Sequence, residues 1–173
     1  MQTQVRILGV DPGLANCGWG VIALSGNKLK PLAYGSISTE ANEYLPARLA
    51  TIYDELSAII IKYSPSELSI ETIYHKGNPR SSIATAQARG VALVTAARSS
   101  LVVSEYAPAA IKKAVVGSGS ATKAQVQFMV QNVLALDHTP EPDHAADALA
   151  AAICHAHQRG YNKLMSRINT LNT

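Results

Sequence analysis

Three acidic residues stand in surroundings where an unpaired charge is hard to explain structurally. Asp11 and Glu71 each end a short apolar run, and Asp147 lies within the alanine-rich stretch 145–150. Carboxylates that meet repel one another unless a cation lies between them, and hard oxygen ligands suit Mg²⁺ or Mn²⁺. Two such ions about 4 Å apart can activate a water and stabilise the departing oxygen of a phosphodiester. Each acid alone is commonly structural, but the three together favour a metal site.

A fourth ligand of this site is expected just before Asp147. His144 precedes it by three residues and Asp143 by four. Both spacings place the side chain on the same helix face as Asp147. Spacing therefore leaves both residues as candidates.

The elements that must position these residues follow from hydrophobic periodicity and turn signals. Strands are predicted over 4–11, 17–24, 29–38, 67–72 and 101–106, and helices over 45–63, 81–99, 108–115, 122–136 and 142–159. The first three predicted strands follow one another directly, and the later strands alternate with helices. This order indicates an α/β domain with a mixed sheet. Asp11 and Glu71 then lie at the carboxyl ends of strands, where such sheets bind ligands. Gly160 is expected to end the last helix, and the final dozen residues to fray.

Length and composition indicate one folded domain over residues 1–173. A chain of 173 residues with 47% hydrophobic and 16% charged residues is neither disordered nor fibrous. Its apolar runs fall short of the ~18 residues that a membrane span needs, and the first residues lack the pattern of a secretory signal. Two cysteines far apart suggest neither a disulfide framework nor a cysteine metal site. We therefore expect a soluble cytoplasmic protein with no membrane partner.

Positive charge is concentrated in the middle of the chain. The net charge is only +3, but residues 72–132 hold seven basic residues against the single acid Glu105, a local charge of +6. Such a tract can bind a polyanion, because each cation brought to a phosphate releases a counterion. The alternative is a solvated basic surface. The basic residues are Lys76, Arg80, Arg89, Arg98, Lys112, Lys113 and Lys123.

Several common site motifs are missing from the sequence. The glycines around Asp11 form neither a G-x-G-x-x-G fingerprint followed by a helix nor a G-x-x-x-x-G-K-[ST] phosphate loop. No G-x-S-x-G elbow supports a nucleophilic serine.

Five motifs in this order and spacing resemble those of the bacterial RuvC Holliday-junction resolvases, from about residue 5 to about residue 158. They are Gly9-Val10-Asp11-Pro12-Gly13, Ile70-Glu71, Gln87-Ala88-Arg89-Gly90, Val116-Gly117-Ser118-Gly119 with Lys123, and His144-Ala-Ala-Asp147-Ala-Leu-Ala. The resemblance implies a ribonuclease H-like α/β fold, with a mixed five-stranded sheet flanked by helices.

The resemblance also implies an activity and partners. Members of this family are structure-specific endonucleases that act in recombination and repair. A homodimer grips four-way junction DNA and nicks two opposing strands symmetrically, beside a branch-migration motor complex of the RuvA and RuvB type. The small-residue helix predicted over 81–99 is similar to the one that the family uses for dimerisation.

The same resemblance assigns the active site. Asp11, Glu71 and Asp147 match the family's metal-binding catalytic carboxylates. Some members carry Asp and others His at the position of His144, so register with the motif favours His144 over Asp143 as the fourth metal-binding catalytic residue. We expect a Mg²⁺-dependent endodeoxyribonuclease with two ions per site, in which Mn²⁺ can substitute.

DNA-binding residues are expected outside the carboxylate set. The resemblance places Lys112 and Lys123 near the scissile phosphate or the DNA backbone. Tyr74, three residues after Glu71, matches the aromatic residue that the family inserts at the junction. Lys76 and Arg80 in the basic tract complete the expected DNA-binding set.

Three alternatives stay open at this point. One is another ribonuclease H-like nuclease, acting on RNA–DNA hybrids or in RNA processing. A second is an actin- or sugar-kinase-like ATPase, whose first phosphate loop resembles residues 9–13, although that fold needs two such domains. A third is a non-catalytic junction-binding protein, against which the retained acids argue.

Overall fold

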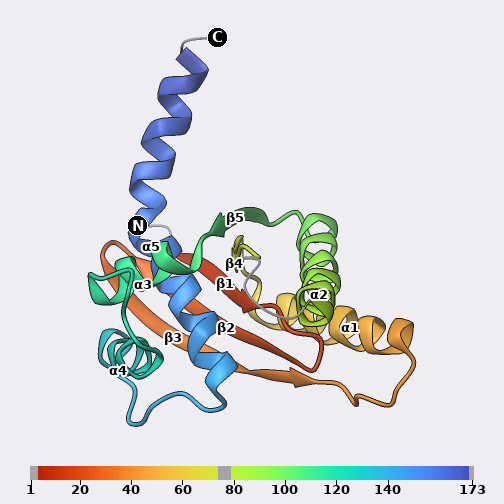
Figure 1. Ribbon diagram of the computed structural model, residues 1–173. Helices are drawn as coiled ribbons and strands as arrows, with labels where there is room; N and C mark the ends of the chain where they lie inside the picture. The colour runs from red at the N-terminus through yellow and green to blue at the C-terminus, as the bar shows by residue number, and fades with distance from the viewer. Residues whose placement is uncertain (1–3, 74–78, 172–173) are drawn as a thin grey trace.

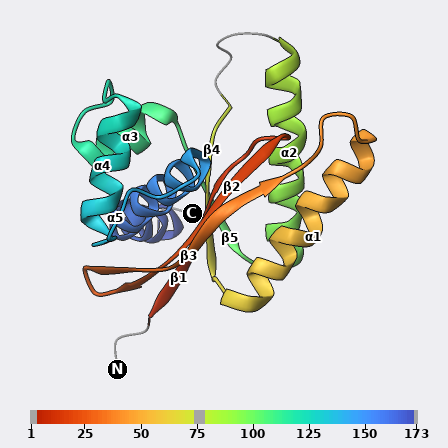
Figure 2. The same cartoon turned by 90° about the horizontal axis from the view of Figure 1, so that it is seen from below.

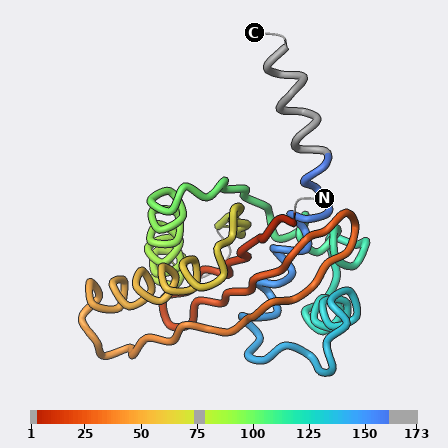
Figure 3. The backbone as a smooth tube through the Cα atoms, turned by 180° about the vertical axis from the view of Figure 1, so that it is seen from behind, coloured from red at the N-terminus to blue at the C-terminus, as the bar shows by residue number. Residues whose placement is uncertain are grey.

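The computed structural model describes residues 4–73 and 79–171, with side chains up to residue 160. Its centre is a five-stranded sheet with the strand order β3-β2-β1-β4-β5 (Figure 1). The strands are β1 (Val5–Asp11), β2 (Asn16–Ser25), β3 (Lys28–Ser38), β4 (Glu67–Glu71) and β5 (Val102–Tyr106). The first three form an antiparallel meander, which Figure 3 shows from behind, whereas β4 and β5 run parallel to β1. The predicted mixed five-stranded sheet is confirmed.

Helices cover both faces of the sheet. They are α1 (Leu45–Tyr63), α2 (Pro79–Arg98), α3 (Pro108–Val116), α4 (Lys123–Val133) and α5 (Asp143–Leu171). Figure 2 shows α1 and α2 on one face and α3, α4 and α5 on the other. Local signals set several ends. Thr122 caps α4 in a reciprocal capping box with Gln125, and Gly117 ends α3 with φ at 89°.

The alternation of side chains along the strands divides the core in two. On β1, Leu8 and Val10 join the cluster under α1 and α2, whereas Ile7 joins the cluster under α3, α4 and α5. Because successive side chains on a strand point to opposite faces, Gly9 and Asp11 share the face of Ile7. The face that carries α5 therefore also carries Asp11.

Glycines let α5 lie unusually close to the sheet. A Cβ added to Gly9 would stand 2.0 Å from the Ala148 carbonyl oxygen, and one added to Gly18 would stand 2.0 Å from that of His144. Gly20 likewise faces the Leu149 side chain. Only glycine allows backbone to approach backbone this closely. These three positions on β1 and β2 consequently set the height of α5 above the sheet.

The end of the last helix differs from the prediction. The sequence predicts that Gly160 stops the helix after Arg159, but α5 continues through Gly160 to Leu171. A glycine ends a helix when it adopts the left-handed conformation. Among the described residues the glycines with positive φ are Gly26 and Gly117, so Gly160 remains an ordinary helical residue. Within the described residues, no helix is long and apolar enough to cross a membrane.

Candidate metal centre and its surroundings

Two neighbouring parallel strands deliver the first pair of carboxylates to one edge of the sheet. The register of β1 and β4 pairs Val10 with Ile70, and Asp11 and Glu71 are the next residues on each strand. On β4, Ser69 points toward α5 and donates to the Ala151 carbonyl at 2.7 Å. The period of two then directs Glu71 to the same face as Ser69. Both acids therefore lie beneath the start of α5.

The first turn of α5 brings His144 and Asp147 to Asp11. Ligand atoms of Asp11, His144 and Asp147 all lie within 4.8 Å of one another, a spacing that could hold a metal ion. His144 Nδ1 lies 2.9 Å from Asp11 Oδ2. A carboxylate can only accept, so Nδ1 carries the proton and donates it. This proton occupies the position between two ligand atoms where a cation would bind.

Glu71 faces the same cluster across a cavity of about 330 Å³. Its walls include Asp11, Glu71 and Asp147, with Lys112 and Lys123 on α3 and α4. Burial, followed by the charges of Asp11 and Asp147, raises the pKa of Glu71 to about 7. Burial also raises the pKa of Asp11, against the opposing effect of the His144 hydrogen bond. Without a cation, the carboxylates thus disfavour one another's charge.

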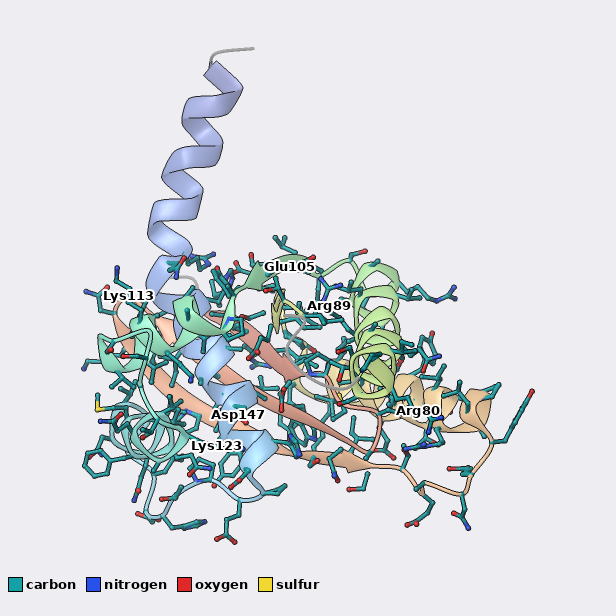
Figure 4. The ribbon with its side chains drawn as sticks, in the orientation of Figure 1. Arg80, Arg89, Glu105, Lys113, Lys123 and Asp147 are labelled. Atoms are coloured by element: carbon teal, nitrogen blue, oxygen red, sulfur yellow. The ribbon has the colours of Figure 1, made fainter. Side chains whose placement is uncertain are left out.

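Lys123 is the counter-ion of this cluster. Its Nζ lies 3.2 Å from Asp147 Oδ2 (Figure 4). The same Nζ lies 3.2 Å from Asp143 Oδ2. Asp143 also accepts from Gln127 at 2.8 Å, and the Lys123 hydrogen bond lowers its pKa. Asp143 thus points to α4, whereas His144 contacts Asp11. Of the two candidates for the fourth ligand, His144 is therefore the one that lies with the carboxylates.

The basic tract does not form a single surface. Lys112 and Lys123 line the cavity with the acids, whereas Arg89 on α2 forms an ion pair with Glu105 on β5 (Figure 4). Arg98 lies in the last turn of α2, away from the metal-type ligands. The charge available near the carboxylates therefore comes mainly from the two lysines.

The remaining expected DNA-binding residues lie around the start of α2. Arg80 is the second residue of that helix and is exposed. Tyr74 and Lys76 lie outside the described residues, so the structure does not place them.

A buried polar network behind the site was not predicted from the sequence. His155, only 3% exposed, donates from Nε2 to Glu67 at 2.7 Å and accepts at Nδ1 from the Tyr106 hydroxyl at 2.7 Å. Arg159 donates to both oxygens of Glu67. The network joins α5 to β4 and β5 and so fixes α5 along its axis. Its only sequence signal is a histidine within an otherwise apolar helix stretch.

The sequence and the fold of this chain match those of known proteins. The family model of the crossover junction endodeoxyribonuclease RuvC matches residues 7–155. The chain belongs to the RuvC family. A relative from Heliobacterium modesticaldum is 50% identical over 151 residues, covering 87% of this chain and 93% of its own. Another, from Syntrophomonas wolfei, is 47% identical over 153 residues, covering 88% and 89%. Both are crossover junction endodeoxyribonucleases of the RuvC family.

A solved structure agrees with the family assignment. The Thermus thermophilus RuvC in complex with a Holliday junction substrate superposes with a TM-score of 0.85 at 30% identity. The match covers 90% of this chain and 94% of that one. The ribonuclease H-like fold expected from the RuvC motifs is confirmed, and the chain is a crossover junction endodeoxyribonuclease of the RuvC family.

Proposed function

We propose that Asp11, Glu71, His144 and Asp147 hold Mg²⁺ and that the site resolves four-way DNA junctions by hydrolysing one phosphodiester in each of two opposing strands. The observation that carries this proposal is the cluster of Asp11, His144 and Asp147, whose ligand atoms lie within 4.8 Å of one another, beside a cavity that Glu71 and two lysines also line. The Thermus thermophilus RuvC was solved in complex with a Holliday junction substrate, which supports the same DNA class as the substrate of this chain.

The donor set fits a hard divalent cation. Three carboxylates supply oxygen ligands, and burial, together with the charges of neighbouring carboxylates, raises the pKa values of both Glu71 and Asp11, an effect that a bound cation would oppose. When bound, Mg²⁺ would polarise the phosphodiester and make an attacking hydroxide available near neutral pH. We propose two ions per site, with Mn²⁺ able to substitute because His144 adds a softer ligand.

The chain's own residues do three things in this reaction. Asp11 and Asp147 hold their positions through the contact of α5 with the sheet. His144 would ligate a cation through Nδ1, the nitrogen that faces Asp11, with the ring proton then carried on Nε2. Lys123 and Lys112 project into the same cavity. Lys123 can turn to a phosphate oxygen once Asp147 no longer requires it as counter-ion.

Symmetric cleavage requires two active sites. We propose a homodimer formed through α2, whose outer face exposes Ile83 and Val94 at 59% and 55%. An exposed apolar face on a helix of small residues supports this choice. Action in the cytoplasm, together with a branch-migration motor of the RuvA and RuvB type, is carried over from the family resemblance.

The test uses one immobile and one mobile four-way junction, labelled in turn on each strand and incubated with the protein and Mg²⁺. We expect paired cuts at symmetric positions on opposing strands, and ends that a ligase can seal. A linear duplex and an RNA–DNA hybrid serve as comparison substrates. Faster cleavage of the hybrid than of the junction would favour a ribonuclease of the same fold, and tight junction binding without cleavage in any divalent cation would favour a binding protein.

A further inference from the structure

A second cavity, of about 350 Å³, lies on the other side of Asp11 and Glu71. It shares these two acids and Pro108 with the lysine-lined cavity, so the two hollows form one trough with the carboxylates in the middle. Its volume is at the lower end of the range for small-ligand sites. A strand that runs along this trough over the carboxylates would contact the walls of both hollows.

Hydroxyl groups from α2 form the outer wall of this second cavity. They belong to the adjacent residues Ser81 and Ser82 and to Thr85, which lies four and three residues further along and therefore on the same side of the helix. Thr95 on the same helix donates to the Val91 carbonyl, and Thr51 on α1 donates to that of Ala47. In the described part of the chain, Ser81, Ser82 and Thr85 form no such hydrogen bond. Their donors are therefore available to a ligand.

The charges around the cavity select its ligand. Its only charged lining residues, among those that the structure describes, are Asp11 and Glu71, which also belong to the metal centre. They repel an anion while they are unpaired and cease to do so once a cation neutralises them. The first turn of α2 carries no acidic residue that would oppose an anion. Three hydroxyl donors then remain for phosphate oxygens.

We propose that this cavity is a subsite for the phosphate adjacent to the scissile one, held by Ser82 and Thr85 with Ser81 at the rim. The inference rests on the proposed function, since the ligand is the strand being cut. It assigns the two hollows different tasks. The lysine-lined hollow draws the backbone in by charge, and the hydroxyl-lined hollow orients the strand only when the metal centre is loaded.

The experiment combines a double variant with a chemical change in the DNA. Ser82→Ala/Thr85→Val removes two hydroxyls at nearly constant volume, and Ser57→Ala on α1, away from both cavities, is the control. Junctions carry a single neutral methylphosphonate at the first phosphate on one side of the cut or on the other. Single-turnover cleavage is measured in Mg²⁺, junction binding is measured in EDTA, and melting temperatures confirm that the variants fold.

We expect the double variant to cut the unmodified junction about tenfold more slowly, with binding in EDTA unchanged. Wild-type protein should show a similar loss with the methylphosphonate on one side only. The two changes together should cost no more than either alone, because both remove the same contact. Full activity of the double variant, or losses that multiply on both sides, would overturn the subsite. Failure of the wild-type protein to cut the unmodified junction would instead overturn the proposed function.

Discussion

Replacing Gly18 with alanine should disturb the geometry of the metal centre while the protein still folds. The added Cβ would stand 2.0 Å from the carbonyl oxygen of His144, 2.4 Å from its carbonyl carbon and 2.9 Å from its Cβ. Ordinary contact begins at 3.4 Å, so the start of α5 must move by about 1.4 Å relative to β2. All three clashing atoms belong to the residue that contacts Asp11. The strain therefore falls directly on the metal ligands.

A displacement of this size is large for catalysis and moderate for folding. Metal–ligand distances tolerate only about 0.2 Å, and a misplacement of about 1 Å can cost a factor of about 100 in rate. Overpacking of a core contact costs about 1–3 kcal/mol of unfolding free energy. We expect Gly18→Ala to fold, to bind junction DNA and to cleave it about 100-fold more slowly than wild type. Circular dichroism, junction binding in EDTA and single-turnover cleavage in Mg²⁺ measure these three properties.

The matched control is Gly160→Ala on the same helix. No atom lies within 4 Å of the position of its added Cβ, and the site is exposed and helical. Alanine there should stabilise the protein by about 0.5–1 kcal/mol and leave cleavage unchanged. If Gly18→Ala cleaves within threefold of wild type, the close contact of α5 with β2 does not set the geometry of the metal centre.

Three further predictions concern individual charged groups. The pKa of Glu71 is raised from 4.5 to about 7 in the metal-free fold, so the stability of the protein should fall as pH rises between these values. In EDTA, the melting temperature of Glu71→Gln should fall less between pH 5 and pH 8 than that of wild type. The same pH dependence in both proteins would refute the shift. Lys112→Ala should slow cleavage and reduce the slope of the logarithm of the junction-binding constant against log salt by about one. Lys113→Ala, outside both cavities, should leave the cleavage rate unchanged. Equal effects of the two substitutions would mean that Lys112 is an ordinary solvated surface residue. His144→Asp should still cleave in Mg²⁺, and Asp143→Ala should also keep cleavage, because His144 contacts Asp11 whereas Asp143 contacts Gln127 on α4. Loss of cleavage in Asp143→Ala, with normal cleavage in His144→Ala, would assign the metal role to Asp143.

Local signals in the sequence predict the parts of the site that depend on neighbouring residues. The apolar run that ends at Asp11 predicts a strand, and the break at Pro12-Gly13 predicts where it stops. The run before Glu71 predicts β4 in the same way. Parallel pairing then brings both carboxylates to one edge. These inferences need only periodicity and turn chemistry.

Contacts between distant residues cannot be predicted in this way. Spacing on one helix leaves Asp143 and His144 equal, because the choice depends on Asp11 and Lys123, which approach from other elements. The sequence predicts one basic tract, but Arg89 forms an ion pair with Glu105, which lies on another element. Gly18 is visible in the sequence, yet its role becomes apparent only once α5 is seen against β2.

Separation of binding from cleavage in Asp147→Asn tests the central claim most directly. Asp147 is a proposed metal ligand that no expected DNA contact requires, and Asp54→Asn on the exposed surface of α1 is the control. In one experiment, junction binding and the cleavage rate are measured over a range of Mg²⁺ concentrations. We predict that Asp147→Asn binds the junction at least as tightly as wild type and nearly abolishes cleavage at every concentration, while Asp54→Asn behaves as wild type. Near-normal cleavage by Asp147→Asn would contradict a carboxylate-held metal as the source of the activity.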